Sequence, residues 1–321
     1  MFAEFVSQFT GFFNTILAMF ILLIIGFIAG KANIIDSVAS KKLSALIIKV
    51  AQPALIIGSL IKMEYSRENL MLGLKTLGFG FVVHGVLAVI AYVACVRFKN
   101  INERKLTEFA TIFGNVGFLG IPVLRSLLGD TGAFMAAFFI VSFNIVLWTW
   151  GIAIMARQRD DIKLTPKKLI NFGTVPCTIG FLLFVFMKPF FDLPSFVMTG
   201  LDYTASLCTP ISMLIIGALL STRTLRQIFA SGKIYFLCFL KLLFTPILVA
   251  TAMKFMGFSQ LWIFFGATVV AMPTATTETM LAELYDIEPG YSAQAVGTTS
   301  LFSVLTMPIV IFYVQMVLLP L

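Results

Sequence analysis

The residues most suited to binding a ligand gather at two interruptions of otherwise apolar segments. Residues 113–122 read Phe-Gly-Asn-Val-Gly-Phe-Leu-Gly-Ile-Pro, and residues 271–278 read Ala-Met-Pro-Thr-Ala-Thr-Thr-Glu. Glycine costs a helix about 1 kcal/mol relative to alanine and an interior proline costs about 3 kcal/mol. Both segments therefore predict a helix that comes apart near its centre. Free N–H groups and the positive half-dipole at the start of the following helix favour an anion at such a break.

The candidate substrate-binding residues are uncharged groups at these breaks or in the apolar segment that follows the first one. We assign to the substrate site Gly114, Asn115, Val116, Gly117, Asn144, Pro273, Thr274, Thr276 and Thr277. Amides and hydroxyls of this kind can hold a carboxylate without the cost of a buried lysine. The alternative for each asparagine is a structural hydrogen bond between helices, which is common in membrane bundles.

Glu278 is the candidate ion-coupling residue. It lies five residues after Pro273, near the predicted bilayer midplane, where an ionisable side chain is a functional candidate. It could take up a proton or help to hold sodium, or it could simply stabilise the first turn of a half-helix. A carboxylate beside an anion site repels the substrate unless it is neutralised, which favours ion coupling. The sequence assigns no role to Lys49, Lys241 or His84, which also lie inside apolar segments.

The composition predicts a polytopic membrane protein. Hydrophobic residues make up 59% of the 321 residues and charged residues 12%, more apolar surface than a soluble core of this size could hide. Four dispersed cysteines and one histidine offer no metal site, disulfide framework or catalytic set, so we expect neither an enzyme nor a cofactor other than a coupling proton or sodium ion. The net charge of +8 is spread over short loops, which argues for membrane orientation and against nucleic acid.

Apolar stretches of about 20 residues or more predict an all-α protein with ten transmembrane helices. They lie near 11–30, 38–62, 69–96, 104–128, 132–156, 169–188, 195–220, 232–255, 260–285 and 291–319. Most loop lysines and arginines follow odd-numbered segments, which predicts cytoplasmic loops there and both termini outside the cell (inner) membrane. No Lys or Arg precedes Lys31, so we expect the first segment to be retained rather than cleaved as a signal peptide.

The largest predicted cytoplasmic loop, 157–168, divides the chain into two halves of five spans each, 1–156 and 169–321. An odd number of spans makes the second half enter the membrane from the opposite side, as in an inverted repeat. Interrupted helices in corresponding positions of two such halves point to the binding site of a transporter.

Motifs in both halves resemble those of a known family of carriers. They are Gly-Asn-Val-Gly-Phe-Leu-Gly-Ile-Pro at 114–122, Thr-Pro-Ile-Ser-Met-Leu-Ile-Ile-Gly-Ala at 209–218, Ala-Met-Pro at 271–273, Leu-Ala-Glu-Leu-Tyr-Asp at 281–286 and Thr-Met-Pro at 306–308. These motifs resemble the auxin efflux carrier family, which includes plant PIN-type auxin transporters and bacterial malonate and malate permeases. The resemblance covers essentially the whole chain. It implies two inverted five-helix repeats, similar to bile-acid symporters, with the fourth and ninth helices unwound and crossing at the substrate site.

The resemblance also implies roles for individual residues. Asn115 and Asn144 match positions that hold the substrate carboxylate, and Pro273 matches the crossover proline of the ninth helix. Gly114 stands where plant members have proline, and Glu278 where they have an apolar residue or proline, which leaves ion coupling open. The short central loop lacks the regulatory insert of many plant members. The family further implies an elevator, with helices 1, 2, 6 and 7 as a scaffold and helices 3–5 and 8–10 as the moving transport body.

We therefore expect a secondary carrier that moves a small organic anion by alternating access. A malonate- or malate-type carboxylate is favoured, followed by an aromatic acid such as indole-3-acetate. The expected partners are this anion, the lipid bilayer and a second copy in a homodimer. The alternatives are a sodium/proton antiporter, a bile-acid-type sodium symporter of similar fold, and a receptor or structural membrane protein without flux. The direction of transport and the coupled ion stay open.

Overall fold

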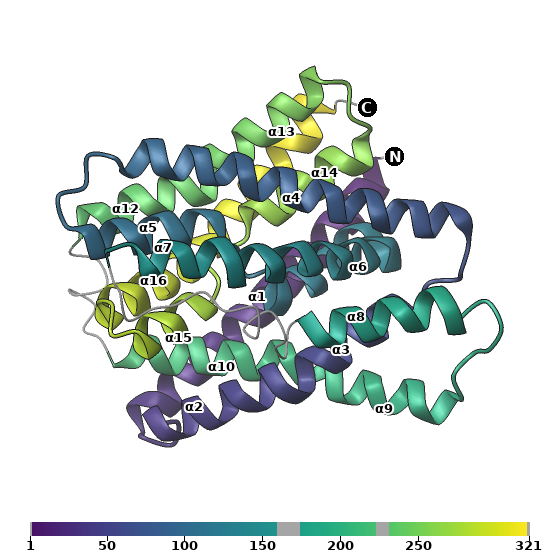
Figure 1. The fold of residues 1–321 in the computed structure, drawn as a ribbon, viewed down its shortest axis with the longest axis horizontal. Helices are drawn as coiled ribbons and strands as arrows, with labels where there is room; N and C mark the ends of the chain where they lie inside the picture. Colours follow the sequence, from purple (N-terminus) through teal and green to yellow (C-terminus); the bar gives the residue numbers. More distant parts are fainter. Residues whose placement is uncertain (1, 159–173, 223–230, 320–321) are drawn as a thin grey trace. The chain divides into compact units, whose positions relative to one another are not determined.

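The computed structural model describes residues 2–158, 174–222 and 231–319, and it is built from helices (Figure 1). Within those ranges the extended pairing is a single antiparallel bridge between Gly114 and Thr274. The all-helical class predicted from the sequence is thus confirmed. Part of the predicted cytoplasmic loop, 159–168, and the start of the predicted second half, 169–173, lie outside the described residues.

The chain divides into two compact units. Unit 1 consists of Met1–Val82, Gly117–Thr149 and Leu164–Ala218, and unit 2 of Val83–Val116, Trp150–Lys163 and Leu219–Leu321. The α-helices α4 (Arg67–Cys95) and α10 (Cys208–Ser221) both run from one unit into the other.

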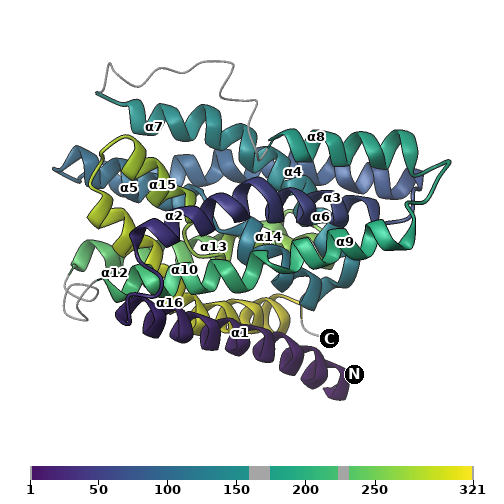
Figure 2. The same cartoon turned by 90° about the horizontal axis from the view of Figure 1, so that it is seen from below.

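In unit 1, α3 packs against both α8 and α9, and the three helices lie side by side in Figures 1 and 2. The elements of this unit are α1 (Phe2–Lys31), α2 (Ser37–Leu46), η1 (Ile47–Ala51), α3 (Gln52–Ile61), η2 (Val116–Gly120), α6 (Ile121–Val146), η3 (Leu147–Gly151), α8 (Thr174–Leu182), η5 (Leu183–Met187) and α9 (Ser195–Ser206). The first residue of η2 and the last two of η3 belong to unit 2. The label η marks a π-helical turn.

In unit 2, the long helix α16 packs against α5, α12, α14 and α15. The elements are α5 (Ile101–Ile112), α7 (Ile152–Ala156), α12 (Gly232–Phe239), η6 (Leu240–Phe244), α13 (Thr245–Phe255), α14 (Gln260–Ala271), α15 (Thr277–Leu284), α16 (Pro289–Tyr313) and η7 (Val314–Leu318). The second interrupted segment therefore belongs to this unit as the α14–α15 pair, whereas the first belongs to it only as far as Val116, as α5 and the start of η2.

Six helical segments in the described ranges are long and apolar enough to cross a membrane. They are Ser37–Ile61, Arg67–Cys95, Ile121–Ala156, Ser195–Ser221, Gly232–Phe255 and Pro289–Leu318, and shorter apolar helices cover Leu17–Lys31, Thr178–Met187 and Gln260–Ala271. Large apolar side chains such as Ile28 on α1 and Val89 on α4 are exposed on the surface. Hydrocarbon is the solvent that suits such surfaces, so the helices are those of a multi-pass membrane protein.

Both predicted breaks are present, and the first is short. Phe113 caps α5 in an extended conformation, and the chain resumes as the wide turn η2 at Val116. The sequence predicts that the helix comes apart within Gly114–Gly120, and the non-helical residues of this range are its first two. In the second break α14 ends at Ala271 and α15 begins at Thr277.

Prolines explain where several of the π turns lie. The turns η1, η2 and η6 each end two residues before a proline, at Pro53, Pro122 and Pro246. A proline within a helix removes a hydrogen-bond donor, and its ring clashes with the carbonyl four residues earlier. One additional residue in the preceding turn moves that carbonyl away and lets the helix continue.

Gly129 separates two helices that share the label α6. Its φ of 64° and ψ of −154° are not helical, and they lie in a region that side chains with a Cβ rarely adopt. This position coincides with the predicted gap between the apolar ranges 104–128 and 132–156. Glycine is thus required here for the chain to leave one helix and start the next.

Helices α1 and α10 approach each other closely through two glycines. A Cβ placed on Gly217 would lie 2.0 Å from the carbonyl oxygen of Leu23, and one on Gly26 would lie 2.2 Å from that of Leu214. Small residues allow such contact between membrane helices. Because the obstacles are backbone atoms, even one methyl group must push the two helices apart.

Replacing Gly217 with alanine should therefore destabilise the protein by about 1–3 kcal/mol, the usual cost of overpacking a tight contact. Thermal unfolding of the purified protein in detergent measures this loss. Gly200→Ala on α9 is the matched control, because a Cβ at Gly200 would meet no atom within 4 Å. Equal melting temperatures for the two variants would contradict the close contact.

Candidate functional site

Helix α5 leads to the first break and carries a series of polar residues. Asn100 caps its start, since its side-chain oxygen accepts hydrogen bonds from the N–H groups of Asn102 at 2.9 Å and Glu103 at 3.4 Å. Thr107 and Thr111 follow at intervals of four residues on the face of Glu103, and each hydroxyl donates to the carbonyl four residues earlier at 2.8 Å. Thr107 and Thr111 are buried. A polar helix buried at membrane depth needs partners from its neighbours.

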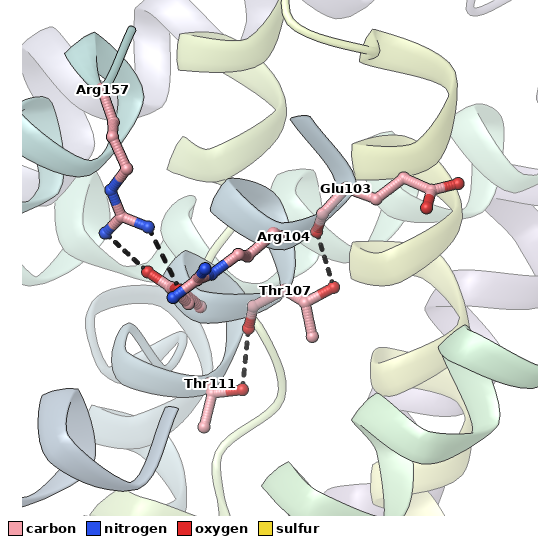
Figure 3. Close-up of polar contacts among 6 residues, drawn as sticks. Glu103, Arg104, Thr107, Thr111 and Arg157 are labelled. Atoms are coloured by element: carbon pink, nitrogen blue, oxygen red, sulfur yellow. Dashed lines mark hydrogen bonds and ion pairs between the residues drawn. The ribbon is translucent and has the colours of Figure 1, made fainter. Parts of the chain in front are cut away.

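Arg104 and Arg157 supply those partners for Glu108 (Figure 3). Arg104 donates from Nε to Glu108 Oε1 at 2.7 Å, and Arg157, just after α7, donates from Nη1 to Oε1 at 3.2 Å and from Nη2 to Oε2 at 2.7 Å. The side chain of Glu108 is only 3% exposed. Such a two-pronged arginine–carboxylate pair is strong and directional, so it fixes α5 against the end of α7.

Two further contacts attach α5 to other helices of unit 2. The hydroxyls of Thr107 and Tyr291 lie 2.8 Å apart, which joins α5 to α16. Lys233, on α12, forms an ion pair with Glu103. The half-helix that carries the first break is thus held from three sides.

The two breaks meet and satisfy each other's backbone. Asn115 donates its N–H to the carbonyl of Pro273 at 2.7 Å, and Ala275 donates its N–H to the carbonyl of Phe113 at 2.9 Å. These are the paired bonds of a short antiparallel bridge. We refer to residues 113–115 and 273–275 together as the crossing. Their non-helical backbone has partners within the protein, as membrane depth requires.

Two more backbone N–H groups at or next to the crossing already donate hydrogen bonds to neighbouring groups. Thr274 donates its N–H to the hydroxyl oxygen of Thr299 on α16 at 3.2 Å, and Val116 donates its N–H to the carbonyl of Gly114 at 2.8 Å. The sequence predicts that amides at this place are available to an anion. In this conformation several of them already have acceptors.

Lys241, to which the sequence assigned no role, lies beside the crossing. Its side chain is 0% exposed, and its ammonium group donates to the carbonyl of Thr111 at 3.0 Å. A Cβ placed on Gly114 would lie 3.4 Å from Lys241 Nζ. The lysine therefore stands at the carbonyl end of α5, where the helix dipole favours a cation. Lys49, in the wide turn η1, is exposed instead.

Glu278 is completely buried in the first turn of α15. Neither of its carboxylate oxygens has a hydrogen bond of normal geometry within the described ranges, and the same holds for the hydroxyl of the adjacent Thr277. Ser292 lies close to the carboxylate, but its hydroxyl bonds to that of Thr279 at 3.3 Å. Buried polar groups without hydrogen-bond partners are uncommon in proteins, and they indicate a place where a proton, an ion or a ligand can bind. Thr276 is partly buried between the crossing and this turn.

The predicted site residues divide between the two units. Gly114, Asn115, Val116, the 273–277 segment and Glu278 belong to unit 2, and Asn115 is 3% exposed. Gly117 and Asn144 belong to unit 1. Gly117 faces the side chain of Gln52, which would lie 2.9 Å from a Cβ at that position. Asn144 is buried and donates from Nδ2 to the carbonyl of Ile140 at 2.9 Å.

His84 was another residue without a predicted role, and it too is near the first break. Its imidazole stacks at an angle on the ring of Phe113, with centroids 5.8 Å apart. The isolated position of one histidine and one lysine in two apolar segments was the only sequence signal for this arrangement. The described residues contain no cluster of three His, Cys, Asp or Glu side chains that could hold a metal ion.

Unit 1 contains a hollow whose lining includes none of the predicted site residues. Its lining includes Lys62, Lys188 and Asp192. Lys188 pairs with Asp192, and Lys62 pairs with Asp202 at 2.7 Å. With both lysines neutralised, the hollow offers an anion little attraction.

The Glu108 cluster gives a testable consequence. Replacing Glu108 with glutamine leaves two arginines around a neutral amide, so we expect the free energy of unfolding to fall by about 1.5–3 kcal/mol. Glu103→Gln is the matched control on the same helix, because its ion pair with Lys233 is partly exposed and should be worth less than about 1 kcal/mol. Thermal unfolding in detergent compares them. A Glu108→Gln variant as stable as the control would remove this cluster as an anchor of α5.

Comparisons with known proteins are consistent with a transporter. The family model described as "Membrane transport protein" matches residues 12–174 and 169–311. An uncharacterized transporter of Methanothermobacter thermautotrophicus is 25% identical over 94% of this chain and 98% of its own. A protein of Rhizobium meliloti, provisionally named a malonate transporter, is 22% identical over 95% of this chain and 96% of its own. An uncharacterized transporter of Methanocaldococcus jannaschii is 24% identical over 91% of this chain and 95% of its own.

These matches extend over nearly the whole chain and include both breaks. The names of the relatives indicate transporters, not enzymes. They agree with the apolar helices and with the paired interruptions of unit 2. The chain belongs to the membrane transport protein family, the family of auxin efflux carriers that its motifs resemble.

Proposed function

We propose that this protein is a secondary carrier of small organic anions that works by alternating access around the crossing. The observation that carries the proposal is the meeting of two broken helices through the Asn115–Pro273 and Ala275–Phe113 hydrogen bonds. Paired broken helices are how many carriers build a substrate site in the membrane. A structural membrane protein has no need of two costly interruptions at one point.

The chemistry around the crossing suits a carboxylate. Asn115, Thr276 and Thr277 offer an amide and two hydroxyls, and α15 begins at Thr277 with the positive end of its dipole. The hydroxyl of Thr277 is buried without a partner within the described ranges, so a ligand oxygen would complete its hydrogen bonding. We propose that Gly114, Val116, Gly117, Asn144, Pro273 and Thr274 complete the site.

Among substrates, a malonate- or malate-type carboxylate is the first candidate and an aromatic acid such as indole-3-acetate the second. The relative from Rhizobium meliloti carries malonate in its provisional name and aligns with 95% of this chain. The two proteins are 22% identical, and the name of this relative makes malonate the first compound to test.

The proposed architecture follows the family. Ten spans form two inverted repeats, 1–156 and 169–321, in the cell (inner) membrane with both termini outside. Helices 1, 2, 6 and 7 form the scaffold and the interface of a homodimer, and helices 3–5 and 8–10 move as an elevator. The close contact of α1 with α10, through Gly26 and Gly217, supports a rigid pair among the proposed scaffold helices.

A cation/proton antiporter or a sodium symporter is the second candidate function. The observation that favours it is the buried carboxylate of Glu278, which lacks a normal hydrogen bond within the described ranges. A proton or a sodium ion would neutralise such a group. In the carrier, the same ion would remove the repulsion between Glu278 and an anionic substrate.

Transport by the purified protein in liposomes decides between these functions. We expect saturable counterflow of radiolabelled malonate or indole-3-acetate, lost when Asn115 is replaced with alanine. Saturable uptake of neutral solutes alone would overturn the anion proposal. Exchange of protons for sodium without any organic substrate would identify the antiporter.

Glu278 makes a separate prediction about the driving ion. Glu278→Gln keeps the size of the side chain but cannot be ionised, so uptake should lose its dependence on pH or sodium. Initial uptake rates over a range of pH and sodium concentrations measure this. Glu68→Gln is the control, because Glu68 is exposed at the start of α4. An unaltered ion dependence in Glu278→Gln would exclude the coupling role.

A further inference from the structure

Lys241 is a buried cation whose position calls for more than a structural explanation. It lies in the wide turn η6, is 0% exposed, and reaches the end of α5 at Thr111. An ammonium group has three hydrogens to donate, and within the described ranges only the carbonyl of Thr111 accepts one. No carboxylate of the described residues lies within ion-pair distance of it.

The surrounding backbone donors are mostly in use. The N–H groups of Asn115 and Ala275 bond across the crossing, and that of Thr274 bonds to Thr299. An anion arriving here therefore finds few free amides in this conformation. When protonated, the side chain of Lys241 has donors to spare and a full positive charge, whereas a helix end supplies about half a charge.

Charge balance points the same way. A buried lysine without a counter-charge is strongly unfavourable in a membrane protein, and such groups mark sites of function. A single carboxylate can be held by helix ends and uncharged donors. A second negative group on the same ligand needs a full cation, and Lys241 beside Gly114 is the one the described part of the crossing offers.

We propose that Lys241 is a substrate-contacting residue that sets the charge selectivity of the carrier. Its ammonium pairs with the second anionic group of a doubly charged ligand, whose first carboxylate occupies the broken-helix site. In the unoccupied carrier the carbonyl of Thr111 holds the ammonium in place. This inference rests on the proposed function, since it assumes that the crossing binds organic anions.

A purely structural role is the competing explanation. Lys241 would then serve only to stabilise the carbonyl end of α5. Its removal would weaken the crossing as a whole, and ligands with one or two charges would lose affinity by the same factor. The two roles are separated by comparing ligands of one skeleton that differ in charge.

Malonate and its monomethyl ester provide that comparison, with two charges and one charge at pH 7.5. We expect the wild-type protein in liposomes to bind malonate more tightly than the ester. In Lys241→Met the malonate affinity should fall about tenfold or more, as for a lost charge-assisted hydrogen bond, and the ester affinity by less than about twofold. Lys241→Arg should retain the preference for malonate.

Lys254→Met is the matched control, because Lys254 is exposed on α13 of the same hydrophobic segment. It should leave both affinities unchanged. Equal losses for malonate and the ester in Lys241→Met would overturn the proposal and leave a structural role.

The wild type gives a test that does not depend on the folding of any variant. Ester binding as tight as malonate binding would refute the role of Lys241 while leaving an anion carrier. Binding of neither compound, nor of indole-3-acetate, would instead refute the proposed function on which this inference rests.

Discussion

The absence of hydrogen-bonding solvent in hydrocarbon is the constraint on which this structure depends. Every N–H and C=O group at membrane depth must find a partner inside the protein. At the crossing, Asn115 bonds to Pro273 and Ala275 bonds to Phe113, so each break supplies what the other lacks. Neither interruption could exist alone without leaving polar backbone exposed. This arrangement gives a carrier a non-helical backbone segment inside the membrane that is still held in one conformation by hydrogen bonds.

The same constraint explains why α5 is tied so firmly to its neighbours. A short helix that stops in mid-membrane has no continuous hydrogen-bonded rod to hold it. Glu108 with Arg157, Thr107 with Tyr291, and Thr111 with Lys241 attach it at successive turns to three other elements. These contacts place charge and polarity in a region that lipid avoids. Glu108 is paired with arginines, whereas Lys241 and Glu278 are exceptions that form no ion pair among the described residues. The exceptions are both buried in the same unit as the crossing.

Local chemistry predicted the breaks, and packing determined the rest. Gly114 and Pro273 weaken helices wherever they occur, so the interruptions could be located from the sequence. Their mutual pairing depends on how distant segments pack, which periodicity does not encode. Lys49 and Lys241 stand in similar wide turns before a proline, yet one is exposed and the other buried, because burial depends on neighbours. In the sequence, Arg104 and Arg157 were two of the positive charges that predicted which loops are cytoplasmic. Such a count does not identify Glu108 as the partner that both arginines share.

The reciprocal pairing at the crossing also bears on how the protein is made. A ribosome delivers Phe113 and Asn115 to the insertion machinery long before it has synthesised Pro273 and Ala275. Until then the backbone groups of Phe113 and Asn115 lack their hydrogen-bond partners in the second break, and lipid cannot supply those hydrogen bonds. The early helices must therefore wait in a sheltered or provisional arrangement, and maturation becomes complete only when nearly the whole polypeptide has entered the bilayer.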